Sequence, residues 1–176
     1  MNTSTLHLEI LPATPQHRTV LQHLFELYCH DFSEMTGEEV AEAGTYLGDD
    51  FLAEWPESGW HPFLVRVNDH WAGFAWVMTG KSYVTPGADH VWMDEFFILR
   101  KYRRQGIGER VAAYLFDRFP GTWEIGEIPN NFNAQTFWRT IVGRYTNGQF
   151  REMTDAGKWH GPIQIFNSAV SRKEQQ

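Results

Sequence analysis

The 176-residue chain has one cysteine, fewer basic than acidic residues and no long apolar run. The single Cys29 excludes an internal disulfide and fits a reducing compartment. The formal net charge of −7 argues against a general nucleic-acid binder, which is usually basic overall. No stretch approaches the ~20 consecutive apolar residues that span a bilayer, so we expect no membrane association.

Targeting and metal signals are also missing. The first eight residues have neither a positive start nor an apolar run, so we expect no signal peptide and a cytoplasmic protein. The eight histidines show no ligand spacing and Cys29 has no partner, so we expect no metal site. No repeat, low-complexity tract or linker divides the chain. We expect one domain over residues 1–176, as a monomer or a small oligomer such as a homodimer.

Apolar spacing predicts alternating strands and helices. Because a helix separates two of the strands, 91–99 and 123–128, these should be parallel and joined by a right-handed crossover. This order predicts an α/β protein with a mixed sheet (α+β). Helices are expected over about 15–30, 38–44, 106–119 and 133–142, and strands over 6–10, 62–67, 71–78, 91–99, 123–128, 145–153 and 162–166.

The run from Met93 to Glu109 carries the clearest chemistry. Its four apolar residues 96–99 are typical of a strand covered on both faces, and four cationic side chains follow within residues 100–104. Gly106 and Gly108 remove side chains where a helix begins, so free N–H groups and the helix dipole can bind an anion. We interpret this as a phosphate site beside an apolar strand; the alternative is an ordinary tight turn with a solvated basic face.

Two motifs resemble those of one family. The segment Arg103-x-x-Gly106-x-Gly108 resembles motif A, Q/R-x-x-G-x-G/A, of the GNAT superfamily of acyl-CoA N-acyltransferases. Further on, Asn131-x-x-Ala134-x-x-Phe137-Trp138 resembles motif B of the same superfamily. A dinucleotide-binding fingerprint fits less well because the third glycine is missing, and there is no Walker A lysine. The resemblance implies the GNAT fold: a central mixed sheet of about seven strands, about four flanking helices and a splayed parallel strand pair.

The resemblance also implies an N-acetyltransferase that moves an acetyl group from the cosubstrate acetyl-CoA to a primary amine. Backbone groups of Phe96, Phe97 and Ile98 would hydrogen-bond the pantetheine amides like an added strand. Asn131 and Trp138 would add further coenzyme contacts. The diphosphate would lie against the segment of Arg103, Arg104, Gln105, Gly106, Ile107, Gly108 and Glu109.

The reaction needs a base for the incoming ammonium and an acid for the departing thiolate. Asp94 stands where related polyamine acetyltransferases carry an acidic residue, and Glu95 is its neighbour, so either is a candidate base. Alternatively, both residues have only a structural role, in which they cap strand ends or pair with nearby arginines. The family often uses a tyrosine seven residues after the motif B asparagine to protonate the thiolate, but Trp138 occupies that place, and indole is a poor acid. Water or another residue must then serve, and Tyr145 is one substitute.

The segment from Asp31 to Gly59 has no Lys or Arg, and it predicts an acidic wall for a small cationic acceptor or simply a solvated loop. Trp55, Trp60 and His61 could stack on such an acceptor or pack as partly buried residues. His30 beside Asp31 is either an acid–base pair or a structural neighbour. The acidic residues are Asp31, Glu34, Glu38, Glu39, Glu42, Asp49, Asp50, Glu54 and Glu57.

Two other functions remain open at this point. One is a coenzyme-A-binding module without turnover, suggested by the missing tyrosine. The other is transfer of a longer acyl group, or transfer to a protein amine.

Overall fold

The computed structural model describes residues 6–171, apart from 49, 54, 56–57 and 86. The chain divides into two compact units, Met1–Trp76 with Glu95–Tyr102 and Val77–Asp94 with Arg103–Gln176. Seven strands are ordered β1-β2-β3-β4-β5-β7-β6 in one sheet, which confirms the predicted mixed sheet. Strands β3 (His70–Thr79) and β4 (Val91–Ile98) run through both units, and each unit is described by itself.

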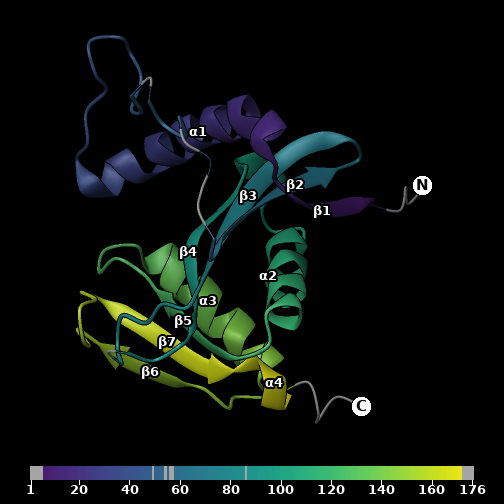
Figure 1. Cartoon of the computed structure of the whole chain (residues 1–176), viewed down its shortest axis with the longest axis vertical. Coiled ribbons are helices and arrows are strands. Elements are labelled where there is room, and N and C mark those ends of the chain that lie inside the picture. Colours follow the sequence, from purple (N-terminus) through teal and green to yellow (C-terminus); the bar gives the residue numbers. More distant parts are fainter. Residues whose placement is uncertain (1–5, 49, 54, 56–57, 86, 172–176) are drawn as a thin grey trace. The chain divides into compact units, whose positions relative to one another are not determined.

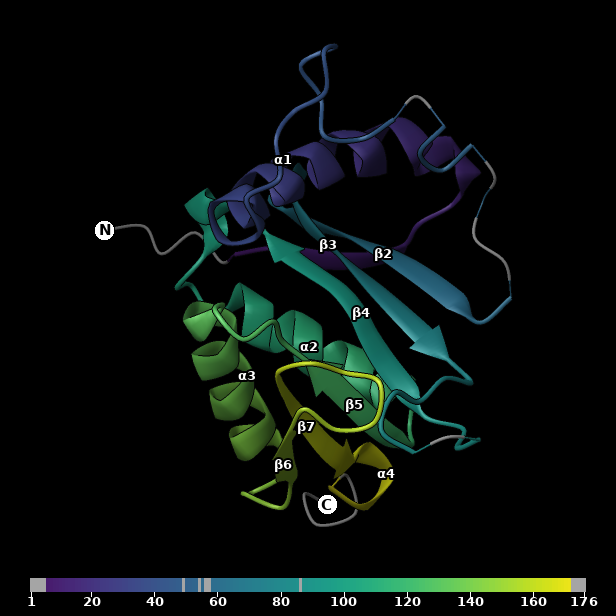
Figure 2. The ribbon, with the colours of Figure 1, turned by 90° about the vertical axis from the view of Figure 1, so that its left-hand side faces the viewer.

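The first unit contains β1 (Leu8–Pro12), β2 (Trp60–Val67) and the long helix α1 (Arg18–Thr36). The short 3-10 helices η1 (Pro15–His17) and η2 (Arg100–Tyr102) also belong to it. Strands β1 and β2 are antiparallel, and α1 lies across β2 and β3 (Figure 2). The helix buries Leu21, Leu24 and Phe25 against an aromatic core that includes Phe74 and Phe97.

The predicted helix over 38–44 is wrong. Gly37, in the left-handed conformation with φ 73°, ends α1 and donates its N–H to the Ser33 carbonyl. Residues 38–44 then form turns, and Val40 remains 47% exposed. With no buried apolar face, this segment has no packing to stabilise a helix. The chain just beyond this segment is tied to α1 by Glu26, whose carboxylate accepts the N–H groups of Tyr46 and Leu47, both at 2.9 Å.

The second unit contains α2 (Ile107–Arg118), β5 (Thr122–Gly126), α3 (Phe132–Tyr145), β6 (Arg151–Thr154), β7 (Pro162–Asn167) and the single turn α4 (Ser168–Ser171). In Figure 1, α2 and α3 lie beside β5 and β7. The buried side chains of α2 are those predicted from its 3.6-residue period: Ile107, Val111, Ala112, Leu115 and Phe116.

The predicted strand over 145–153 begins too early. Tyr145 is the last residue of α3, because its ring packs on Phe116 at 5.0 Å and its hydroxyl donates to Asp117 Oδ1 at 2.8 Å. Thr146 and Gly148 then turn the chain, and β6 starts only at Arg151. The contact with Phe116 joins residues 29 positions apart, so local spacing could not show it.

The parallel pair of β4 and β5 is confirmed. The pairing joins Val91 to Trp123 and Trp92 to Glu124, and it does not continue to Asp94 and Gly126. Gly126 is required on β5, because a Cβ there would lie 2.5 Å from Trp159 Cε2 and 2.7 Å from Trp92 Cη2. Two indoles therefore pack where the two strands part.

No helix in the described part of the chain has the length and apolar character needed to cross a bilayer.

Candidate active site

The start of α2 has the geometry of an anion site. Gly106 caps the helix in the left-handed conformation (φ 74°, ψ 0°) and has no side chain to bond the N–H groups of the first turn. Arg104 also has a positive φ, 60°, so two left-handed residues, Arg104 and Gly106, lie on either side of Gln105 just before the helix. Such alternation turns successive N–H groups toward one concave face, which suits a phosphate. A Cβ at Gly106 would meet no protein atom within 4 Å, so within the chain the need for glycine lies in the left-handed backbone, and the clearance for an anion stays a prediction.

The charges around this helix start favour an anion. Arg103, Arg104 and Arg110 are all exposed. The one acidic residue in the first turn, Glu109, pairs with Arg144 of α3 at 3.0 Å, and both side chains are substantially exposed. The pair offsets the negative charge that Glu109 would otherwise place beside the helix start.

The predicted pantetheine contacts lie in the first unit. Phe97 is buried among Phe74 and Tyr28, so its side chain belongs to the core and only its backbone is available for the predicted role. Gly73 of β3 lies beside this backbone, because a Cβ at Gly73 would overlap the carbonyl oxygen of Phe97. Phe96 is half-buried and Ile98 is buried. Their contacts with the coenzyme remain predictions.

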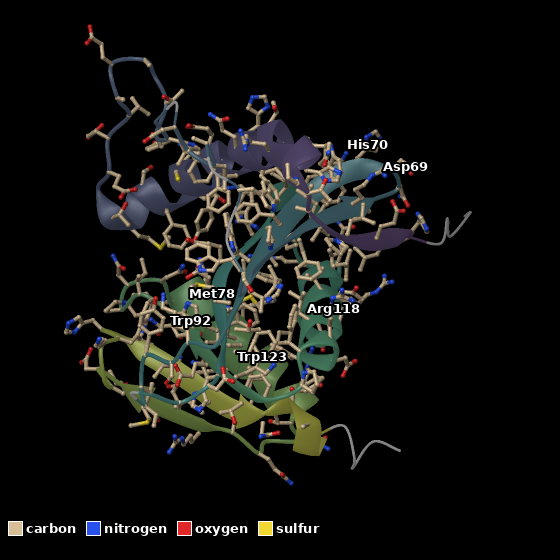
Figure 3. All side chains as sticks on the ribbon, viewed as in Figure 1. Asp69, His70, Met78, Trp92, Arg118 and Trp123 are labelled. Atoms are coloured by element: carbon tan, nitrogen blue, oxygen red, sulfur yellow. The ribbon has the colours of Figure 1, made fainter. Side chains whose placement is uncertain are left out.

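Asp94 lies in the second unit with a defined partner. Its Oδ1 accepts the indole N–H of Trp92 at 3.1 Å. Burial raises the pKa of Asp94 above its ordinary value, while the Trp92 hydrogen bond and the positive charge of Lys81 act in the opposite direction. Figure 3 labels Trp92 with its neighbour Met78, both members of a buried cluster with Ile163. A half-buried carboxyl with one fixed hydrogen bond is a suitable proton acceptor.

Glu95 belongs to the first unit, and its negative charge acts on α1. With burial as the larger cause, the charges of Glu38, Glu26 and Glu95 raise the pKa of the Cys29 thiol. Cys29 is therefore a poor nucleophile, because the reactive thiolate is disfavoured. The roles of Asp94 and Glu95 as bases remain predictions.

The residues of motif B have clear structural tasks. Asn131 caps α3, and its side-chain oxygen accepts the N–H of Ala134 at 3.0 Å. Trp138 is buried against Phe116, whereas Phe137 is half-buried. Tyr145 donates its hydroxyl to Asp117, near the last residues of α2. That bond uses the hydroxyl proton, which makes Tyr145 a poor substitute acid.

Sequence analysis missed a group of polar residues that lie on or beside β5. Glu124 is fully buried, and its carboxylate binds Ser82 Oγ and His90 Nδ1, each at 2.6 Å, and the Tyr83 N–H at 2.8 Å. Glu127 is 4% exposed and accepts the side-chain amide of Gln164 at 3.2 Å. The sequence signal for this group is a pair of glutamates, Glu124 and Glu127, which with Gly126 interrupt an otherwise apolar segment.

The acidic segment is partly engaged within the protein. Asp31 pairs with Arg100 at 2.8 Å, and Glu34, Glu38, Glu39, Glu42 and Asp50 are half-buried or exposed. The remaining three acidic residues, Asp49, Glu54 and Glu57, lie outside the described residues. Trp60 is 42% exposed and contacts Trp76 edge-on at 5.6 Å, so it packs on one side and remains accessible on the other. Within the described residues, no group of three or more His, Cys, Asp or Glu side chains could hold a metal.

A mixed sheet with a parallel pair that parts beyond two residues, followed by a helix capped by Gly106, is the α/β arrangement that the sequence predicts. The chain belongs to the acetyltransferase (GNAT) family, whose model matches residues 21–143. It is therefore an acyltransferase. No curated protein sequence matches the chain significantly.

Solved structures share this fold at low sequence identity. An acetyltransferase from Thermus thermophilus is 18% identical with a TM-score of 0.65, over 91% of this chain and 96% of that one. The aminoglycoside acetyltransferase AAC(6')-Ib in complex with coenzyme A is 11% identical with a TM-score of 0.63, over 97% and 100%. The ribosomal-protein-S18-alanine N-acetyltransferase from Escherichia coli is 15% identical with a TM-score of 0.54, over 90% and 91%.

Proposed function

We propose that the protein transfers an acetyl group from acetyl-CoA to the primary amine of a small cationic acceptor. The observation that carries the proposal is the start of α2, where Gly106 caps the helix without a side-chain bond and arginines flank the approach. A diphosphate matches this combination of N–H donors, helix dipole and positive charge. Asn131 and Trp138, with the backbone of residues 96–98, are the further predicted coenzyme contacts.

Transfer of an acetyl group from a thioester to an amine needs little from the protein beyond positioning the two reactants. A thioester is already activated, and holding it beside a neutral amine supplies much of the rate enhancement, up to about 7–11 kcal/mol for ideal orientation. Asp94 removes the proton of the incoming ammonium, either directly or through water. With Trp138 buried and Tyr145 bonded to Asp117, water protonates the departing thiolate.

A matched pair of glycine variants tests the diphosphate site. Gly106→Ala places a side chain at φ 74°, which strains the backbone by about 1–2 kcal/mol. We expect the affinity for acetyl-CoA to fall about tenfold in calorimetry, since that factor corresponds to about 1.4 kcal/mol. Gly148→Ala is the control, because Gly148 has a similar φ of 81° and equally open space but follows the far end of α3. Equal losses of affinity in both variants would refute the site.

Thiol release tests the reaction itself. Acetyl-CoA is incubated with the protein and a panel of polyamines, aminoglycosides and peptides that begin with alanine. We expect amine-dependent release, and a fall of about 10²–10⁴-fold in kcat for Asp94→Asn, the usual contribution of a general base. The matched variant Glu95→Gln retains activity if Asp94 is the base. No release across the panel would reject the proposal.

The preference for a cationic acceptor is supported by the acidic segment that includes Glu38, Glu39 and Glu42. Such a segment attracts cations over about a Debye length, and salt weakens this attraction. We expect the KM for a polyamine to rise between about 0.05 and 0.5 M salt while the KM for a neutral amine stays constant. An unchanged polyamine KM would assign these acidic residues to solubility.

The second candidate, a coenzyme-binding module without turnover, is favoured by one observation. Trp138 replaces the usual tyrosine and is 5% exposed, so it supplies no acid. Tight binding of acetyl-CoA in calorimetry without thiol release for any amine would identify this function.

A further inference from the structure

Lys81 is an ammonium group held by the protein beside the candidate base. It follows β3 in the second unit, and its Nζ lies 4.6 Å from the centroid of the Tyr83 ring and 4.0 Å from Met78 Sδ. An ammonium over an aromatic face is stabilised by the ring's negative charge density. Tyr83 and Met78 therefore keep the amine of Lys81 at a defined place instead of leaving it in bulk solvent.

The loop that carries Lys81 is anchored at several points. Glu124 accepts the Ser82 hydroxyl at 2.6 Å and the Tyr83 N–H at 2.8 Å. The Tyr83 carbonyl accepts the N–H of Lys158 at 2.9 Å. Because Glu124 is fully buried, these bonds are shielded from water and fix the backbone next to Lys81.

The same aromatic residues connect Lys81 to Asp94. The Tyr83 ring lies 4.3 Å from the Trp92 ring, and Trp92 donates its indole N–H to Asp94 at 3.1 Å. The charge of Lys81 acts on Asp94, whose pKa it lowers against the larger effect of burial. Within the described part of the chain, no direct ion pair joins the two groups, which leaves Asp94 able to accept a proton from an amine.

We propose that Lys81 is itself an acceptor, so that the protein acetylates its own Lys81 when acetyl-CoA is bound and no better amine is present. The inference rests on the proposed function, because it uses the thioester that function brings to Asp94. It adds a modification site to the enzyme. Lys81 and the proposed free acceptor belong to the same substrate class, the primary alkyl ammonium ions.

The step balances without any further reactant. The Lys81 ammonium gives one proton to Asp94 through water, and the Nζ lone pair then forms a bond with the thioester carbonyl carbon. The C–S bond breaks, the thiolate takes a proton from water, and the hydroxide so formed takes the second proton of Nζ. Asp94 then releases its proton to the solvent. The products are N-acetyl-lysine, coenzyme A and one released proton, with no change in oxidation state.

Peptide mapping of the full-length protein tests the proposal. The protein is incubated with deuterated acetyl-CoA without added amine, and the label is quantified over time at Lys81, Lys101 and Lys158. Lys101 is the matched control, because its Nζ also lies over an aromatic ring, Tyr102 at 5.3 Å, but its side chain is exposed. We expect Lys81 to be labelled at least tenfold faster than either control, with a first-order rate that is independent of protein concentration.

Two variants complete the test. Asp94→Asn should slow Lys81 labelling without slowing the background at Lys101, and Lys81→Arg should remove the fast label. Equal labelling of all three lysines, or a rate proportional to protein concentration, would overturn the inference. An unlabelled Lys81 in the incubation without amine, in a protein that turns over an added amine in a separate assay, would overturn the inference alone. Failure to bind acetyl-CoA would overturn the proposed function with it.

Discussion

The buried carboxyl of Glu127 predicts an unusual dependence of stability on pH. Burial raises its pKa to about 8, with the nearby negative charge of Glu152 acting in the same direction, while the Gln164 hydrogen bond and Arg139 oppose the shift. Glu127 Oε1 is buried without a hydrogen-bond partner, so ionisation would leave part of the charge uncompensated. The folded protein therefore holds a proton on Glu127 that the unfolded chain releases near its ordinary pKa of 4.5.

The sign and size follow from proton linkage. Between about pH 4.5 and 8 the folded state binds one proton more than the unfolded state at this group, so stability falls as pH rises. At about 1.36 kcal/mol for each pH unit, the loss across this window is at most about 5 kcal/mol. Glu152 acts differently: its hydrogen bond to Arg139 lowers its pKa, so its contribution is lost only in acid. Glu152 therefore adds little slope at neutral pH, and a Glu127 variant is needed to separate Glu127 from other titrating groups such as Asp94.

Urea denaturation of the wild type and Glu127→Gln between about pH 5 and 8.5 measures this effect. Glutamine keeps the size of the side chain but cannot ionise, so the variant should match the wild type near pH 5 and exceed its stability by several kcal/mol near pH 8.5. Comparing the two proteins cancels the titration of histidines and other carboxyls. Glu109→Gln, at a partly exposed ion pair, should leave the pH dependence unchanged. A wild type and Glu127→Gln with parallel stability curves would refute the reasoning.

Two smaller predictions concern the packing of the second unit. Gly126→Ala should destabilise the protein by about 1–3 kcal/mol in urea denaturation, because the new methyl group overlaps Trp92 and Trp159. A change below about 0.5 kcal/mol would mean that the two indoles move freely. Asn131→Ala should cost about 1 kcal/mol through loss of the α3 cap, and Asn131→Asp should restore most of it; if Asp restores nothing, the cap is not the cause.

The parts of the fold that depend on local periodicity were predictable. All five buried residues of α2 follow its helical spacing, and the parallel pairing of β4 with β5 follows from the helix that connects them. The position of Gly106 at the start of α2 was also predictable, since a glycine-rich turn after a buried strand needs positive φ. The structure adds that Gly106 supplies a left-handed backbone, while its predicted clearance for an anion stays a prediction.

The missed features depend on contacts between distant residues. Segment 38–44 has the length of a helix, but its residues are exposed, so no tertiary packing stabilises a helix there. The environment of Glu127 depends on Gln164, which is 37 residues away and reaches it through the pairing of β5 with β7. Likewise, Lys81 and Asp94 become neighbours only through Tyr83 and Trp92. Such partners lie beyond the range of any spacing rule.

The two carboxyls with raised pKa values differ in the groups that oppose the effect of burial. At Glu127, burial and Glu152 act together, so the carboxyl is largely protonated at neutral pH and cannot accept another proton. At Asp94, burial is opposed by the Trp92 hydrogen bond and by Lys81, which keeps an ionised form accessible. A general base must be ionised at its working pH. The environments of the two side chains therefore favour Asp94 as the base and leave Glu127 as a neutral partner of Gln164.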